Sequence, residues 1–403
     1  MNKIIISALA VTLTACGGGG SGSAPAPTPN NDGGNGEIRT PAFSTDHLTT
    51  IKADYARNRS IEGAGVTLAI LDSGVNVNHD EFAGKTLNPN SGSYVSAISA
   101  YTLDEIEDMG LSGLDLYQPV ATGDQEDVFG HGTHVTSMAW GENVGVAPEA
   151  DVIMMDVYAT TSPDSLAVKG IISDLATMDV DFINASLTGV DYFENSEFIN
   201  ERPLYEALDT ADMGFVVAAG NFGLDMTETF ITNPVNCGEL SDAERQDNLT
   251  CTFTFDATSV DLLAKDAELA DNFLWVGAVD NNGLPAEFLL ADGTEVGTNV
   301  PGSDADIQAR WISAPGSAVD GAFFNNDTDY LAVSGTSQAA PLVTGAAALV
   351  KGQFPTLSNA AVLQILLDTA DNSFSAYDPA IHGQGILDIE AALNIDPTNY
   401  AAL

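Results

Sequence analysis

Four side chains in this sequence are of the types that acyl transfer requires: Asp72, His131, Asn221 and Ser337. A serine hydroxyl becomes a nucleophile when a histidine accepts its proton and a carboxylate holds that histidine in the required tautomer. An amide N–H can then stabilise the oxyanion that forms on the attacked carbonyl. Asp, then His, then Ser is one of the three chain orders in which unrelated folds carry this triad.

Each of the four residues lies where a strand is expected to end or a helix to begin. Asp72 and Asn221 follow buried apolar runs, and the carboxyl ends of parallel strands form the edge where open α/β sheets bind ligands. Ser337 opens an apolar helix, whose N-terminus favours developing negative charge. Taken singly, Asp72 could be a turn or cap residue and Ser337 an N-cap.

His131 also opens a helix, and His134 lies three residues later on nearly the same face. Such a pair could bind zinc, but no third ligand motif accompanies it. His134 is therefore expected to be a structural histidine.

Short apolar runs alternate with helical patterns along most of the chain. The expected strands are 66–71, 152–158, 180–186, 215–219, 274–279, 310–314 and 331–333. The expected helices are 131–141, 164–178, 197–213, 337–352 and 359–370. This alternation predicts one α/β domain with helices on both faces of a parallel sheet. The domain is expected to span residues 61–397, after a lead-in at 39–60 and with an acidic insertion at about 224–271.

Two long motifs resemble those of the subtilisin-like serine peptidases, the subtilases: Gly-His-Gly-Thr-His at 130–134 and Gly-Thr-Ser-Gln-Ala-Ala-Pro at 335–341. Shorter matches are Asn-Ala-Ser-Leu at 184–187, Ser-Ala-Pro-Gly at 313–316 and Gly-Gln-Gly-Ile-Leu-Asp at 383–388. The resemblance covers about residues 61–393. It implies a three-layer α/β fold with a mostly parallel central sheet.

The resemblance also implies a role for each of the four residues. His131 is expected to act as general base and then general acid, while Asp72 orients its ring. Ser337 is expected to attack a peptide carbonyl and form an acyl-enzyme, and Asn221 to bind the oxyanion together with the backbone N–H of Ser337. The expected reaction is hydrolysis of protein or peptide substrates without a catalytic cofactor.

Two other functions remain open at this point. A subtilase-fold protein could bind peptides or surface partners without turnover, although all four positions are intact. A different acyl hydrolase could use the same triad, but the Gly-x-Ser-x-Gly motif of that class does not surround Ser337.

The resemblance places the substrate pocket at Ser186, Leu187, Thr188 and Gly189. Subtilases usually have glycine at the position of Thr188, so the preference of the pocket is not predicted. Calcium is common in the family and acidic loops abound, but no stretch has the spacing of a recognised calcium loop. We therefore expect calcium as a possible ligand and assign it no site.

The first sixteen residues indicate export. Lys3 precedes an apolar run at 4–13, which is too short to span a bilayer and typical of a signal peptide. Leu13-Thr14-Ala15-Cys16 resembles a bacterial lipobox, which implies a signal peptide at 1–15 and acylation of Cys16. Residues 16–38 would then be a flexible tether to the cell envelope, at the outer membrane of a Gram-negative bacterium. An ordinary signal peptide cut after Ala15 is the alternative.

Export would place Cys237 and Cys251 where disulfides persist. We expect them to pair with each other and close a small loop. Two free thiols are the alternative, and a metal site is less favoured because no histidine is near them in sequence.

The chain is strongly acidic, with 57 Asp and Glu against 12 Lys and Arg and a formal net charge of −45. Beyond residue 59 only seven basic residues remain. They cannot form the basic stripe that nucleic acids require or a polybasic membrane patch. We expect the charge to keep the surface solvated, with attraction of cationic substrates as the alternative.

Overall fold

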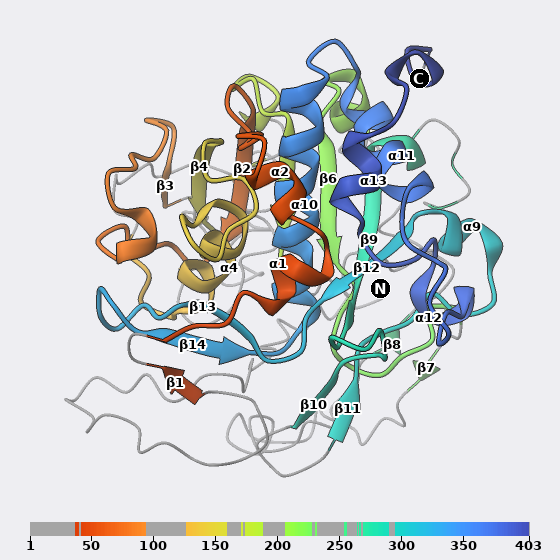
Figure 1. Cartoon of the computed structure of the whole chain (residues 1–403), viewed down its shortest axis with the longest axis horizontal. Coiled ribbons are helices and arrows are strands. Elements are labelled where there is room, and N and C mark those ends of the chain that lie inside the picture. The colour runs from red at the N-terminus through yellow and green to blue at the C-terminus, as the bar shows by residue number, and fades with distance from the viewer. Residues whose placement is uncertain are drawn as a thin grey trace, which may run out of the picture.

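The computed structural model describes residues 37–39, 42–93, 126–158, 171, 174–187, 206–227, 230–231, 254–255, 264, 266, 269–289 and 295–402. A seven-stranded sheet forms the centre, in the order β12-β9-β6-β5-β2-β4-β3 (Figure 1). All six pairs of neighbouring strands are parallel. The strands are β2 (Thr67–Asp72), β3 (Gly92–Ser93), β4 (Asp151–Asp156), β5 (Phe182–Ala185), β6 (Gly214–Ala218), β9 (Phe273–Val279) and β12 (Trp311–Pro315).

Helices pack on both faces of this sheet. The helices that the structure describes are α1 (Asp46–Thr50), α2 (Asp54–Arg57), α4 (His131–Trp140), α9 (Ala305–Ala309), α10 (Thr336–Gln353), α11 (Asn359–Asp368), α12 (Pro379–His382) and α13 (Ile389–Leu393). Single 3₁₀ turns are η1 (Asp80–Phe82), η4 (Ala270–Asn272) and η5 (Pro397–Asn399). The expected helices at 164–178 and 197–213 lie largely outside the described residues, although 174–175 and 206–210 are helical.

Strand β2 shows why the fold has three layers. Leu68 and Ile70 point into one hydrophobic core, which the buried face of α10 completes. Ala69 and Leu71 point into a second core on the opposite face. Successive side chains of a strand point to opposite faces of the sheet, so a continuous apolar run is buried only when other elements pack on both faces. The three-layer α/β fold is confirmed.

The expected strand at 331–333 forms outside the central sheet. It is β14 (Tyr330–Val333), the middle strand of an antiparallel sheet with β1 (Glu37–Arg39) and β13 (Val319–Ala322). β14 leads directly into α10. β1 includes the last two residues of the segment in which we expected a tether.

Two small antiparallel pairs lie at the periphery. They are β10 (Glu287–Leu289) with β11 (Glu295–Gly297), and β7 (Phe230–Ile231) with β8 (Thr254–Phe255). The second pair falls within the expected acidic insertion. Cys237 and Cys251, like Cys16 and the expected signal peptide, lie outside the described residues. Over the described ranges, no helix combines the length and apolar character that crossing a bilayer requires.

Candidate active site

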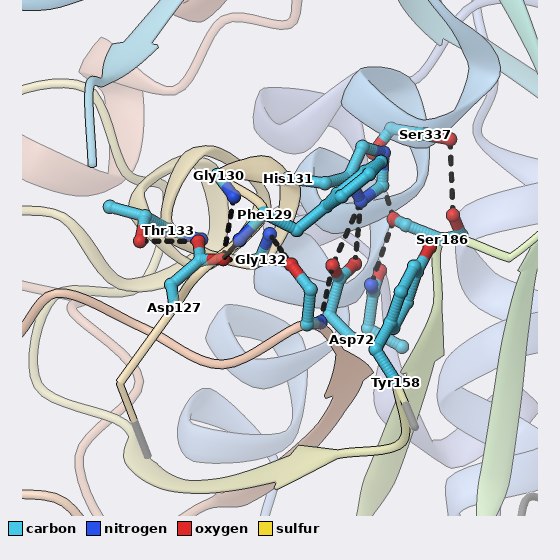
Figure 2. A network of polar contacts seen from close by, with 12 residues as sticks. Asp72, Asp127, Phe129, Gly130, His131, Gly132, Thr133, Tyr158, Ser186 and Ser337 are labelled. Atoms are coloured by element: carbon cyan, nitrogen blue, oxygen red, sulfur yellow. Dashed lines mark hydrogen bonds and ion pairs between the residues drawn. The ribbon is translucent and has the colours of Figure 1, made fainter. Parts of the chain in front are cut away.

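The fold brings the four candidate residues to the carboxyl edge of the central sheet. Asp72 is the last residue of β2, and Asn221 lies three residues beyond the end of β6. His131 is the first residue of α4, and Ser337 is the second residue of α10. Figure 2 shows the imidazole ring of His131 between Asp72 and Ser337.

Asp72 and His131 form a closely bonded, buried pair. The ring Nδ1 of His131 lies 2.8 Å from Oδ1 and 3.0 Å from Oδ2 of Asp72. Asp72 is fully buried, and the backbone N–H of Ser73 donates to its Oδ1. A carboxylate in this position keeps a proton on Nδ1, which leaves Nε2 free to accept one.

The electrostatic surroundings favour a positive charge on His131. Burial alone would lower the pKa of His131, but the charge of Asp72, its hydrogen bond and the charge of Asp127 together raise that pKa above its ordinary value. The two carboxylates therefore stabilise the imidazolium that proton transfer from a serine would create.

Asp127 is a second buried carboxylate at this site that was not predicted from the sequence. It accepts five hydrogen bonds, from the Ser73 hydroxyl, the N–H groups of Phe129 and Gly130, and both the N–H and the hydroxyl of Thr133. Its burial raises its pKa, and the bonds from Thr133 and Gly130 oppose that rise. The only sequence signal for this role is an acidic residue ahead of a helix N-terminus.

Gly132 allows α4 to approach the end of β2 closely. A Cβ atom at this position would overlap the carbonyl oxygen of Gly74 and lie 3.0 Å from the nitrogen of Ser73. The N–H of Gly132 also donates to the Ser73 hydroxyl at 2.9 Å. The glycine after His131 thus keeps His131 within reach of Asp72.

Ser337 is 2% exposed and makes two hydrogen bonds with Ser186. Its hydroxyl donates to the carbonyl oxygen of Ser186 at 3.1 Å, and the Ser186 hydroxyl donates to the carbonyl oxygen of Ser337 at 2.8 Å. The Ser337 hydroxyl is therefore directed to Ser186 and not to His131. Catalytic hydrogen bonds often form only when substrate is bound, so this geometry is compatible with a nucleophile at rest.

The amide of Asn221 is oriented by the residue that precedes Ser337. Its Oδ1 accepts from the N–H of Thr336 at 2.9 Å and from the Thr336 hydroxyl at 3.0 Å. The same hydroxyl accepts from the N–H of Gly220. Because the amide oxygen is occupied, the Nδ2 group is left to donate elsewhere. A Cβ on Gly335 would lie 3.3 Å from this Nδ2, so glycine keeps the space in front of the amide open.

The pocket residues predicted from the resemblance are described only in part. Ser186 and Leu187 are buried beside Ser337 and in the second core, respectively. Thr188 and Gly189 lie outside the described residues. Ser186 was expected to bind substrate, and the contact of its side chain with Ser337 was not predicted from the sequence.

His134 has the contacts expected of a structural histidine. Its Nε2 lies 3.0 Å from the carbonyl oxygen of Leu331 and 3.2 Å from that of Val319, so it connects α4 to β14 and β13. Within the described part of the chain, no group of three His, Cys, Asp or Glu residues could hold a metal ion. Calcium remains a prediction without a site.

Comparison with known proteins identifies the family. Residues 63–385 match the model of the subtilase family, Peptidase S8. Subtilisin DY of Bacillus licheniformis is 28% identical over 356 residues, which cover 86% of this chain and 97% of that protein. The subtilisin-like protease PopC of Myxococcus xanthus is 27% identical over 323 residues, covering 78% of this chain and 57% of PopC.

Solved structures agree on the fold. The epidermin leader peptide processing serine protease of Staphylococcus aureus has a TM-score of 0.59 at 21% identity, covering 88% of this chain and 82% of that chain. A cold adapted subtilisin-like serine proteinase has a TM-score of 0.51 at 22% identity, covering 81% of this chain and 89% of that chain. The family model spans the residues that carry the Asp72–His131 pair, Asn221 and Ser337, and peptidases of this family need no cofactor for catalysis. This chain belongs to the subtilase family and is a subtilisin-like serine endopeptidase.

Proposed function

We propose that this protein is a lipid-anchored, extracytoplasmic serine endopeptidase whose triad is Asp72, His131 and Ser337. The observation that carries the triad is the 2.8 Å contact between Asp72 and the ring Nδ1 of a histidine that opens α4, with Ser337 at the start of α10 beside it. Asn221 is the proposed oxyanion donor.

The acylation step follows from these positions. Ser337 Oγ attacks the carbonyl carbon of the scissile peptide, and His131 Nε2 takes the hydroxyl proton. The negative charge moves to the carbonyl oxygen, where the Nδ2 group of Asn221 and the N–H of Ser337 donate to it. Asp72 stabilises the imidazolium throughout. His131 then gives its proton to the leaving nitrogen, so the C–N bond breaks and an acyl-enzyme remains.

Deacylation repeats these roles with water as the nucleophile. His131 takes a proton from the water as its oxygen attacks the acyl carbon, and then returns the proton to Ser337 Oγ as the ester bond breaks. The carboxylic acid product leaves, and the enzyme is restored. Protein or peptide substrates are the expected partners.

A fluorophosphonate probe tests the proposed triad, because it reacts only with an activated serine. We expect labelling of the wild-type protein, its loss in Ser337→Ala, and hydrolysis of a peptide library with the same dependence. A folded wild-type protein that neither labels nor hydrolyses peptides would instead support the non-catalytic binding protein.

The proposed anchor is supported by Leu13-Thr14-Ala15-Cys16 after the apolar run at 4–13. Acylation would attach the protein to the envelope without the basic patch that its composition lacks. Expression in a Gram-negative host with labelled palmitate tests this. We expect incorporation into the wild type but not into Cys16→Ser, whereas equal incorporation would exclude Cys16 as the acylated residue.

The pairing of Cys237 with Cys251 is also part of the proposal. Alkylation of the unfolded protein with and without reductant would count the thiols, and we expect Cys237 and Cys251 to react only after reduction. Reaction of both without reductant would show that they are free.

A further inference from the structure

Helix α10 contains a proline that leaves the carbonyl of Ser337 without its usual partner. The C=O of Ser337 would accept from the N–H four residues later, but that residue is Pro341, which has none. The hydroxyl of Ser186 takes this place at 2.8 Å. A side chain from the edge of the sheet therefore replaces a backbone hydrogen bond at the proposed nucleophile.

Asn184, in strand β5, holds the Ser186 hydroxyl in the required orientation. A hydroxyl that donates to Ser337 must accept its next bond from elsewhere, and the Asn184 Nδ2 group donates to it at 3.0 Å. If the amide were reversed, the Ser186 hydroxyl would donate to Asn184 and leave the Ser337 carbonyl unpaired. The bond to Ser337 thus selects one orientation of the amide.

Thr344, which lies in the same helix as Ser337, provides the third side chain of this hydrogen-bonded group. Its hydroxyl lies 3.0 Å from Oδ1 of Asn184 and 3.1 Å from the carbonyl oxygen of Ala340. Asn184, Ser186 and Thr344 are each at most 1% exposed. When the single proton of the Thr344 hydroxyl goes to Asn184, donors and acceptors run in one direction, from Thr344 through Asn184 and Ser186 to the Ser337 carbonyl, away from water.

We infer that Thr344, Asn184 and the Ser186 hydroxyl form a buried positioning chain that sets the placement of Ser337. The inference rests on the proposed function, in which Ser337 is the nucleophile. The three side chains act through Ser337 and not on the substrate. They fix the carbonyl of Ser337, and through it the position of the Oγ atom and of the N–H that is proposed to bind the oxyanion.

The expected effect is on turnover more than on substrate binding. Catalytic groups must be held within a fraction of an ångström, and a misplacement of 1 Å can cost about 10²-fold in rate. We expect Thr344→Val to lower kcat about tenfold, because it removes the donor to Asn184 without changing the shape of the site. Ser186→Ala removes the bond to Ser337 itself and should lower kcat by about 10- to 100-fold. KM should change less than kcat in both variants.

Matched variants separate positioning from general destabilisation. Thr344→Ser keeps the hydroxyl and should restore most of kcat. Ser313→Ala removes the hydroxyl of another serine that is 1% exposed, on β12, and should leave kcat within about twofold of the wild type. Active-site titration with the fluorophosphonate corrects each kcat for the folded fraction, and thermal unfolding reports stability separately.

The experiment measures kcat, KM, the labelling rate and the pH profile of kcat/KM for these variants. We expect lower kcat and slower labelling with an unchanged acidic limb, because the Asp72–His131 pair is not altered. If Thr344→Val and Ser186→Ala match Ser313→Ala in kcat, the positioning chain is wrong while the proposed triad stands. If the wild type shows no labelling that depends on Ser337, the proposed function itself fails. Should Thr344→Val be too unstable to purify, Ser186→Ala decides by the same comparison.

Discussion

Ser186 and Ser337 hold each other by two hydrogen bonds that run in opposite directions, hydroxyl to carbonyl in each case. In the proposed mechanism the bond from Ser337 must break before reaction, because the same proton has to reach His131. A hydrogen bond of this kind contributes about 1 kcal/mol net, which is small beside a catalytic barrier. The bond from Ser186 can persist throughout, so one member of the pair releases the nucleophile while the other keeps its backbone in place.

Replacing the carboxylate of the proposed triad should nearly abolish turnover. We expect Asp72→Asn to lower kcat about 10⁴-fold, because the amide favours the wrong tautomer of His131, and serine peptidases with this substitution set that scale. Peptide hydrolysis at pH 8 measures it, with Glu149→Gln as a control that removes a carboxylate at an exposed position. A loss of less than tenfold would contradict the role of Asp72.

The oxyanion assignment makes a separate prediction. Asn221→Ala should lower kcat by about 10²–10³-fold with little change in KM, on the scale known for the oxyanion asparagine of subtilisin itself. The amide helps only once charge has developed on the substrate oxygen. Steady-state kinetics measures kcat and KM of this variant, with Asn282→Ala as the control because Asn282 is an exposed asparagine. An unchanged kcat would remove Asn221 from the site.

Gln338 should be a site where a less polar residue stabilises the fold. Its side-chain Nε2 is buried without a hydrogen-bond partner among the residues that the structure describes, and the residue is 1% exposed. A buried donor without a partner costs about 1–3 kcal/mol, and methionine has a similar volume without that donor. We expect Gln338→Met to raise the free energy of unfolding by about 1 kcal/mol. Urea unfolding measures this, and a loss of stability would show that the amide is paired in solution.

Two buried histidines should make the protein sensitive to mild acid. Burial lowers the pKa of His47 and of His134 to about 4 in each case, against hydrogen bonds that the rings donate to backbone carbonyls and that raise the pKa. The unfolded state, with a pKa near 6.5, then binds protons more readily than the folded state as the pH falls. The contribution of these two histidines to stability should be constant above about pH 6.5 and decline towards pH 4, by about 3 kcal/mol for each histidine.

His47→Gln isolates one of these contributions. Glutamine can still donate to the carbonyl of Val144, as His47 does at 2.9 Å, but it does not titrate. The slope of unfolding free energy against pH between 6.5 and 4 should therefore be shallower in this variant. Identical slopes in urea titrations of the variant and the wild type would assign the acid sensitivity to other groups.

The central sheet could be predicted from the sequence because its strands are short apolar runs. The run at 68–71 is buried on both faces, and the six predicted strands of this sheet end within two residues of the observed positions. Asp72, His131 and Ser337 could be singled out because each lies in a short motif at the end of a strand or the start of a helix. Strand positions and these motifs are both properties of local sequence.

The contacts that support these residues could not be predicted in this way. Asp127 reaches Ser73 across 54 positions, and Thr344 reaches Asn184 across 160. The bonds of Asp127 to Phe129, Gly130 and Thr133 are local, but its bond to Ser73 depends on the closeness of two elements. The contact of Thr344 with Asn184 depends on such closeness as well. Strand β13 was missed because Asp320 and Gly321 interrupt its apolar character. Gly321 is needed there, since a Cβ atom would lie 2.7 Å from the ring of His134.

The pairing of β1 with β14 determines which side of the enzyme faces a support when the enzyme is attached through its N-terminal segment. β1 runs antiparallel to β14, with Glu37 opposite Ala332, and β14 leads within four residues to Ser337. Figure 1 shows β1 on the side of the molecule towards which β6 points. A support coupled to the chain just before Glu37 would therefore attach on the side of the molecule that carries the proposed active site. On a surface-bound preparation, large folded substrates would be hindered by the support and short peptides would not, whereas attachment through the C-terminus would leave both unhindered.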